Sequence, residues 1–235
     1  MSTPIVFLPG YLCDPQMYLA QVLHLSHSHT VINAPLLGER CEEMASALLP
    51  SLPPRFALVG ACLGGIVALE IMRRAPERVT RACLISTDAL VEAPQAIAAR
   101  EPVIVHARAG HIDDALTVSL PEEVLAPGPY RSEVLDYYRR MARSFGPQGM
   151  IAQTRAFQRR RDHQATLRMV HCPVRVIGGA HDTLVTPKRQ AFMAEMLSHG
   201  SYSQIEGAGH LPTLEAAHEV SDILRDWMSR KPLAA

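Results

Sequence analysis

The chain lacks paired cysteines in the spacing that metal and redox sites require. Its five cysteines are dispersed, at Cys13, Cys41, Cys62, Cys83 and Cys172, and no CxxC motif occurs. Neither a structural zinc site nor a thioredoxin-like motif is therefore indicated. Unpaired thiols are typical of a reducing compartment. We expect a cytoplasmic protein with reduced, mostly buried cysteines and no bound metal.

An excess of charge of one sign is also missing. The sequence has 23 Lys and Arg residues against 23 Asp and Glu residues, so its formal net charge is zero. A nucleic-acid-binding surface needs a basic excess, and so does a polybasic contact with an anionic membrane. We therefore expect neither nucleic acid nor a membrane as a partner.

Long hydrophobic runs and aromatic residues are scarce. The apolar run Ile5–Leu8 near the N-terminus is shorter than the hydrophobic region of a signal peptide, and no stretch reaches the about 18 apolar residues of a membrane span. We expect a soluble, unprocessed protein. One Trp and five Phe favour a small or aliphatic ligand over a large aromatic one.

Short apolar runs alternate with helical patterns over most of the 235 residues, a length that favours one domain. This alternation indicates βαβ units around a mostly parallel sheet, because parallel strands are covered on both faces. Strands are expected at residues 5–8, 29–33, 56–59, 82–86, 174–177 and 202–205. Helices are expected at residues 39–49, 63–74, 187–197 and 213–228.

The pattern changes between residues 89 and 166, where helical spacing dominates, as in Ser132–Phe145 and Met150–Arg161. We expect a helical cap at 89–166, inserted into a core made of 1–88 and 167–235. The apolar side chains of the cap would supply a substrate pocket, although most of them would serve to pack its helices.

The segment around Cys62 carries the clearest chemical signal. An expected strand passes through Gly60, Cys62 and Gly64 into an expected helix. This is the nucleophile elbow G-x-S-x-G with Cys in the Ser position. Small flanking residues allow the strand and helix to approach closely, and the helix N-terminus favours a negative charge on the central side chain.

An acid and a histidine follow in the order that a catalytic triad needs. Asp182 lies at the end of the strand expected at 174–177, and His210 lies on a loop before the last helix. His210 would take a proton from Cys62, and Asp182 would orient the imidazole. Asp88 is an alternative acid, because it follows the strand expected at 82–86. We treat His181, beside Asp182, as a rim residue.

With these three matches in order, the chain resembles the α/β-hydrolase superfamily along essentially its whole length. It is most similar to compact bacterial carboxylesterases and enol-lactonases that have a helical cap. The segment Pro9–Asp14 takes the place of the family's oxyanion loop, with Pro9 replacing the usual His. The resemblance implies an oxyanion hole formed by the backbone N–H groups of Tyr11 and Leu63.

The resemblance also implies the activity. It indicates an acyl hydrolase that cleaves a small ester, lactone or thioester through a covalent acyl-enzyme, without a cofactor, as a monomer or homodimer. Two alternatives stay open on the same scaffold. One is another reaction of this triad, such as carbon–carbon bond hydrolysis, a lyase or a perhydrolase reaction. The other is a catalytically weak relative that binds a small ligand.

Cys62 departs from the serine that is usual at its position. Either a serine has been replaced there, or the thiol is the natural nucleophile, as in dienelactone hydrolases. An ordinary thiol has a pKa of about 8.5, which a neighbouring histidine and a helix N-terminus lower. Cys62 could then exist as a thiolate paired with imidazolium.

Two further clusters have less specific interpretations. His24, His27 and His29 could suggest a metal site, but no Asp or Glu lies near them, so a solvated loop is the better interpretation. The run Arg159–Arg161 could form an anion site, but a solvated helix end in the cap fits the neutral chain better.

Overall fold

The computed structural model describes residues 3–230, and six parallel strands form its central sheet. The order across the sheet is β2-β1-β3-β4-β5-β6. The strands are β1 (Ile5–Leu8), β2 (Val31–Asn33), β3 (Phe56–Ala61), β4 (Val79–Ile85), β5 (Val174–Gly179) and β6 (Gly200–Ile205). The predicted fold class, an α/β fold with a parallel sheet, is confirmed.

Strands β1 and β3 carry no polar side chain, because both faces of the sheet are covered there. Every residue of β1 and β3 is buried, and the register pairs Leu8 of β1 with Gly60 of β3. The ends of these two strands therefore lie side by side. Because β2 lies on the other side of β1, this pair is also where the strand order reverses, a usual place for a ligand in such folds.

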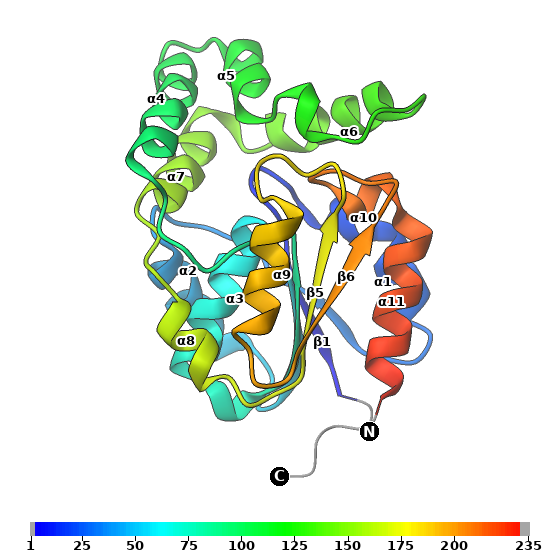
Figure 1. The fold of residues 1–235 in the computed structure, drawn as a ribbon. Coiled ribbons are helices and arrows are strands. Elements are labelled where there is room, and N and C mark those ends of the chain that lie inside the picture. Colours follow the sequence, from blue (N-terminus) through cyan, green and yellow to red (C-terminus); the bar gives the residue numbers. More distant parts are fainter. Residues whose placement is uncertain (1–2, 231–235) are drawn as a thin grey trace.

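Helices form a layer on each face of the sheet (Figure 1). One layer consists of α1 (Leu19–Leu25) and α11 (Ala217–Ser229), which contact each other. The other consists of α2 (Cys41–Leu48), α3 (Leu63–Arg74), α8 (Gln164–Met169) and α9 (Pro187–Glu195). Short 3-10 helices lie in the connections between these elements, at Pro15–Tyr18, Leu49–Ser51, Pro76–Arg78 and Glu122–Val124.

Four further helices lie above the carboxyl ends of the strands (Figure 1). They are α4 (Pro94–Arg108), α5 (Ile112–Ser119), α6 (Arg131–Arg143) and α7 (Gly146–Gln158). All four come from the segment between β4 and β5, where the sequence predicts the helical insertion. Their position places this segment over the loops that carry Cys62, Asp182 and His210.

The two ends of this segment meet at one point of the core. The backbone N–H of His163 donates to the carbonyl of Ala89, at 2.7 Å. The predicted cap boundary at residue 166 falls inside α8, which packs against α3. We therefore propose that the cap ends near residue 163 and that α8 belongs to the core.

The prediction of one continuous helix over residues 213–228 is wrong in one respect, because the helix is broken at Ala216. A short helix, α10 (Pro212–Glu215), precedes α11, and the backbone of Ala216 has φ −134° and ψ 51°. The Glu215 carboxylate accepts backbone N–H groups of Ala126, Gly209 and Leu211. These bonds hold the Glu215 side chain against the loop that carries His210, and the helical backbone is interrupted at Ala216 before α11 begins.

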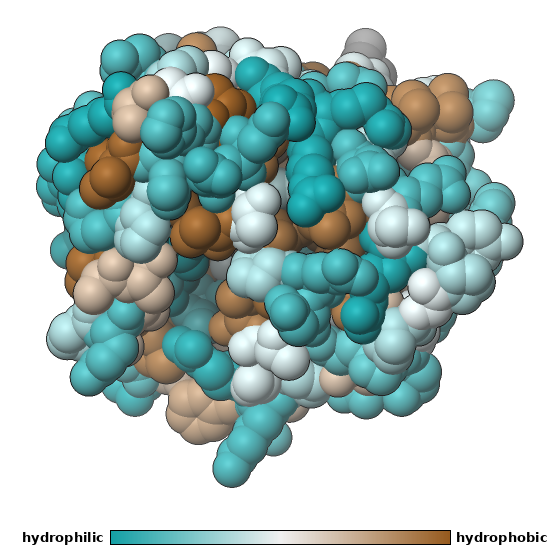
Figure 2. Space-filling model, turned by 90° about the horizontal axis from the view of Figure 1, so that it is seen from above, coloured by the Kyte–Doolittle hydropathy of each residue, from teal (hydrophilic) through white to brown (hydrophobic). Residues whose placement is uncertain are grey.

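The surface on the cap side is largely hydrophilic, with hydrophobic residues in separate patches (Figure 2). Within residues 3–230, each helix is too short or too polar to cross a membrane. The apolar side chains of the cap are mainly directed inward, where Leu116, Leu120, Tyr138 and Met141 are buried.

We expect His163 to make the stability of the protein depend on pH. Burial lowers the pKa of this imidazole from 6.5 to about 4. The unfolded chain therefore binds a proton at His163 that the folded chain does not, and folding free energy is lost as the pH falls from 6.5 toward 4. At pH 5 the loss from this residue is about 2 kcal/mol.

Urea unfolding at pH 7.5 and pH 5 measures this effect. His163→Gln should lose about 2 kcal/mol less on acidification than the unsubstituted protein. The exposed His111 provides a matched control as His111→Gln. Equal losses in the unsubstituted protein and His163→Gln would show that another group carries the acid sensitivity.

Candidate active site

Cys62 stands at a sharp turn between β3 and α3. Its backbone has φ 49° and ψ −111°, a conformation that side-chain-bearing residues rarely adopt. A Cβ at Gly60 would lie 2.4 Å from the carbonyl oxygen of Gly64, and a Cβ at Gly64 would lie 2.2 Å from that of Leu8. Only glycine fits at both positions. The strand–turn–helix expected from the sequence is present, with Cys62 between β3 and α3.

The structure brings together the three residues that the sequence singles out. His210 Nε2 lies 3.2 Å from Cys62 Sγ, and His210 Nδ1 lies 2.9 Å from Asp182 Oδ2. His210 and Asp182 are buried, whereas Cys62 is partly exposed. Each contact is within the range that proton transfer and orientation of an imidazole require.

The surroundings of the two candidate acids distinguish them. Asp182 Oδ1 accepts the backbone N–H groups of Leu184 and Val185, both at 2.9 Å, which leaves Oδ2 facing His210. Asp88 instead forms ion pairs with Arg160, at 3.3 Å, and Arg189, at 2.6 Å. Among the described residues, Asp182 is the carboxylate hydrogen-bonded to His210.

The electrostatics of the site favour a charged Cys62–His210 pair. Burial would raise the pKa of the Cys62 thiol, but His210, the Tyr11 N–H and Arg100 together lower it below its ordinary value. Burial would lower the pKa of His210, but the Asp182 carboxylate and Cys62 raise it well above 6.5. The arrangement therefore stabilises a thiolate beside an imidazolium, held by a carboxylate.

The two backbone N–H groups expected to bind an oxyanion both lie next to Cys62. Leu63 begins α3, so its N–H has no acceptor within the helix. Tyr11 lies on the loop after β1, and its N–H faces Cys62 closely enough to lower the thiol pKa. In the hydrogen bonds of residues 3–230, neither N–H has an oxygen acceptor, and the Tyr11 N–H faces the Cys62 sulfur instead, so a substrate oxygen beside the sulfur can accept from both.

Helix α7 of the cap holds the loop that carries Tyr11. Gln153 Oε1 accepts the backbone N–H of Leu12 at 2.7 Å, and Gln153 Nε2 donates to the Leu36 carbonyl at 3.1 Å. The Tyr11 hydroxyl bonds to Thr154 Oγ1 at 2.7 Å. Leu12 has a positive φ of 51°, which these contacts stabilise. The cap therefore shapes the loop as well as covering it.

A cavity of about 300 Å³ opens between the cap and the strand ends. Cys62, His210 and Tyr11 form its floor, and Leu120, Tyr138 and Phe157 are among its cap residues. Its volume is at the small end of the range for ligand sites. A ligand in this cavity would meet the sulfur and the free N–H groups together.

Comparison with known proteins places this geometry in a family. The model of the alpha/beta hydrolase family matches residues 5–223, which is most of the chain. The chain belongs to the alpha/beta hydrolase family. The prediction of a hydrolase of the carboxylic ester type, which the resemblance implied, is confirmed.

Relatives of this hydrolase include several esterases. A pimeloyl-[acyl-carrier protein] methyl ester esterase of Aromatoleum aromaticum is 29% identical, over 96% of this chain and 98% of the relative. A malate-bound thermophilic esterase of Thermogutta terrifontis has 25% identity and a TM-score of 0.85, over 97% of this chain and 90% of its own. The enol-lactonase of Burkholderia xenovorans LB400 has 21% identity and a TM-score of 0.86, over 98% and 92%, and shares the fold.

The structure corrects the interpretation of Arg159–Arg161 in this hydrolase. Arg159 is exposed and pairs with Glu39, as a solvated helix end would. Arg160, however, is only 9% exposed and pairs with Asp88 and Glu92 at the cavity. Arg100, Gln153 and Glu215 are further residues near the site that the sequence interpretation missed, because their contacts join segments far apart in the chain.

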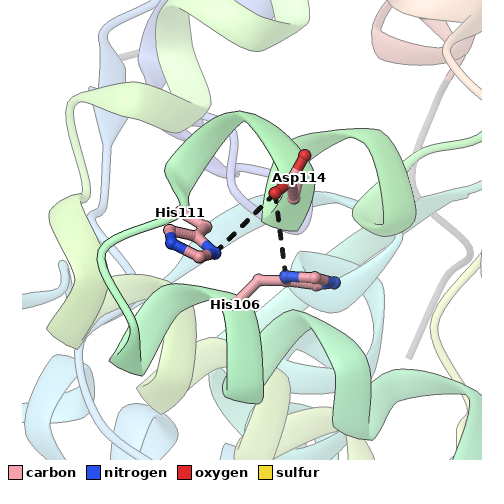
Figure 3. Close-up of side chains that lie close together, drawn as sticks. All are labelled: His106, His111 and Asp114. Carbon is pink, nitrogen blue, oxygen red and sulfur yellow. Dashed lines mark ion pairs between the residues drawn. The ribbon is translucent and has the colours of Figure 1, made fainter.

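A cluster of possible metal ligands lies on the cap, away from Cys62. His106 Nδ1 and His111 Nδ1 are each 3.9 Å from Asp114 Oδ2, where α4 turns into α5 (Figure 3). His111 and Asp114 are largely exposed, as surface ion pairs are. The histidines considered from the sequence do not join a cluster of this kind among the described residues; His24 bonds to Arg225 instead.

Gln153→Leu should lower kcat about 10- to 100-fold with little change in KM, because the Tyr11 N–H loses the support of its loop. Steady-state kinetics with a neutral ester measures this. Gln148→Leu, at an exposed position of the same helix, is the matched control. An unchanged kcat in a folded Gln153→Leu variant would exclude this positioning role.

Proposed function

We propose that the protein is an acyl hydrolase that cleaves a small ester, lactone or thioester, with Cys62 as nucleophile, His210 as general base and acid, and Asp182 as the residue that orients His210. The contact of His210 Nε2 with Cys62 Sγ, at 3.2 Å, carries this proposal. The esterase relatives support the reaction class, and the cavity of about 300 Å³ supports a small substrate.

In the first half of the reaction, the Cys62 thiolate attacks the acyl carbonyl carbon. A carbon–sulfur bond forms, and the electron pair of the carbonyl moves to oxygen, where the N–H groups of Tyr11 and Leu63 stabilise it. The tetrahedral intermediate expels the alcohol oxygen, which takes the proton from the His210 imidazolium. The acyl group is then held on Cys62 as a thioester.

In the second half, water replaces the alcohol. His210 takes a proton from the water as its oxygen attacks the thioester carbonyl, and the same two N–H groups stabilise the new oxyanion. The carbon–sulfur bond breaks, the acid leaves, and Cys62 returns to the thiolate. Asp182 stabilises the imidazolium whenever His210 carries the second proton.

The thiols of the chain make the nucleophile testable by labelling. Burial raises the pKa of Cys41 to about 12 and that of Cys172 to about 11, and it also raises those of Cys13 and Cys83. At neutral pH, Cys62 is therefore expected to react first with iodoacetamide.

Intact mass measured after mixing with a p-nitrophenyl ester tests the covalent step. We expect a burst of nitrophenol and one acyl adduct, located on Cys62 by peptide mapping and missing in Cys62→Ala. No adduct together with no selective alkylation of Cys62 would contradict the proposal. Release of acid by a Cys62→Ala variant at the normal rate would do so as well.

A further inference from the structure

Five charged side chains form a connected network along one wall of the cavity. Arg100 pairs with Glu92, Arg160 lies 3.5 Å from Glu92 and 3.3 Å from Asp88, and Arg189 lies 2.6 Å from Asp88. All five side chains line the cavity that contains Cys62. Three guanidinium groups thus share two carboxylates, and the network carries one positive formal charge.

The carboxylate oxygens of the network face guanidinium groups or a backbone N–H. Asp88 Oδ1 accepts the Leu90 N–H and faces Arg160, while Asp88 Oδ2 faces Arg189. Both oxygens of Glu92 face Arg100, and one of them also faces Arg160. The Arg189 contact is an ion pair without hydrogen-bond geometry, so Asp88 Oδ2 has no hydrogen-bond partner among the described residues. The three guanidinium charges of the network nevertheless exceed the two carboxylate charges.

One buried arginine donor of the network has no acceptor in the part of the chain that the structure describes. Arg160 is nine-tenths buried, and its Nε has no partner among the described residues. A buried N–H without an acceptor is costly, and the cost is greater on a charged group. A network that served only to tie the cap to the core would be expected to satisfy this donor. This wall of the cavity therefore lacks an acceptor for the Arg160 Nε–H, and an anionic ligand would supply one.

Arg100 is held close to the reacting atoms. Its guanidinium lies 4.2 Å from the centroid of the Phe157 ring and 5.7 Å from that of Tyr11, so it is fixed between two aromatic faces. Its charge also reaches Cys62, whose pKa it helps to lower. Glu92 occupies Nε and one Nη2 proton of Arg100, so Nη1 and the second Nη2 proton are left to bind a carboxylate in the same cavity.

The triad does not duplicate this function. The charge of His210 is matched by Asp182 and Cys62, and the remaining oxygen of Asp182 is occupied by backbone N–H groups. A second carboxylate in the cavity would therefore find its donors on the arginine wall. The cavity thus offers two separate sites, one for a carbonyl at Cys62 and one for an anion at the arginines.

We propose that the substrate carries a free carboxylate besides its scissile ester or lactone, and that Arg100, Arg160 and Arg189 bind this carboxylate. The substrate class is then a monoester of a dicarboxylic acid, or a lactone that bears a carboxyl group. This inference rests on the hydrolase function proposed above, because it concerns the second end of the molecule cleaved at Cys62.

Two esters of equal chain length test the inference. Monomethyl adipate carries a carboxylate, and methyl hexanoate presents the same methyl ester without it. We expect the unsubstituted protein to show a kcat/KM at least about tenfold higher for monomethyl adipate, because its carboxylate can make charge-assisted hydrogen bonds that methyl hexanoate cannot. Methanol release measured at pH 7.5 gives both values.

The variants Arg100→Gln and Arg189→Gln should reduce this ratio toward one. The Arg189 side chain is 40% exposed, so its replacement should leave the fold intact even if Arg100→Gln does not fold. The matched control is Arg140→Gln at an exposed position of α6 outside the cavity, which should keep the ratio. Far-UV circular dichroism checks the folding of each variant.

A ratio near one in the unsubstituted protein, or a ratio that survives both arginine substitutions, would overturn the carboxylate site and leave the hydrolase function standing. Hydrolysis of neither ester, without an adduct on Cys62, would instead count against the hydrolase function. In that case thermal shift with adipate against neutral adipamide still decides the inference. Stabilisation by adipate alone, lost in Arg189→Gln, supports the anion site, and equal shifts overturn it.

Discussion

Replacement of Cys62 by alanine should lower kcat for ester hydrolysis by about 10⁴-fold or more. The variant keeps a small side chain that the turn accommodates, but it removes the sulfur proposed to form the acyl-enzyme. The proposed oxyanion donors, the N–H groups of Tyr11 and Leu63, stay in place, so KM should change less than kcat. Steady-state kinetics with a p-nitrophenyl ester, combined with intact mass, measures both effects.

The variant Cys62→Ser determines whether the site is adapted to sulfur. We expect kcat to fall about tenfold or more, because a hydroxyl does not ionise as the thiol does beside His210, Arg100 and the Tyr11 N–H. A large gain in turnover would show the opposite. The site would then be shaped for serine, and the cysteine would be a replacement.

Replacement of Asp182 by asparagine should lower kcat about 10²- to 10⁴-fold. The carboxylate accepts a hydrogen bond from His210 Nδ1 at 2.9 Å, and it raises the imidazole pKa. An amide can accept this bond but cannot stabilise the imidazolium. Without this carboxylate the pKa of His210 should fall, so the part of the kcat/KM pH profile that depends on His210 should move to lower pH in the Asp182→Asn variant.

The same substitution at Asp88 separates the two candidate acids. Asp88→Asn should keep the rate on a neutral ester within about tenfold, because Asp88 pairs with Arg160 and Arg189 rather than with His210. If Asp88→Asn abolishes hydrolysis while Asp182→Asn remains active, the assignment of the acid is wrong. Thermal unfolding of both variants controls for loss of the fold.

The features predictable from the sequence are those with local physical causes. The turn at Cys62 needs Gly60 and Gly64 for steric reasons, and both are visible in the sequence. Asp182 follows β5 and His210 follows β6, and the carboxyl ends of parallel strands lie at one edge of the sheet. For this reason the order of the motifs is sufficient to bring the three residues together.

The features that could not be predicted depend on contacts between distant segments. Arg160 lies in a run of three arginines, and nothing in that run shows that Asp88 and Glu92 will bury one of them. The break at Ala216 depends on Glu215, whose carboxylate finds donors on a distant cap loop as well as beside His210. Apolar periodicity cannot detect a side chain used in this way.

The meeting of Ala89 and His163 has a consequence for divergence among relatives. A segment that leaves and rejoins the core at one place can change in length or sequence without rearranging the strands. Selectivity can then evolve by exchange of this segment while the chemistry stays in the core. The exchange is constrained, however, because Gln153 and Thr154 hold the loop of Tyr11. A transplanted segment must bring equivalent hydrogen bonds to this loop, or the recipient will bind its new substrate and turn it over slowly.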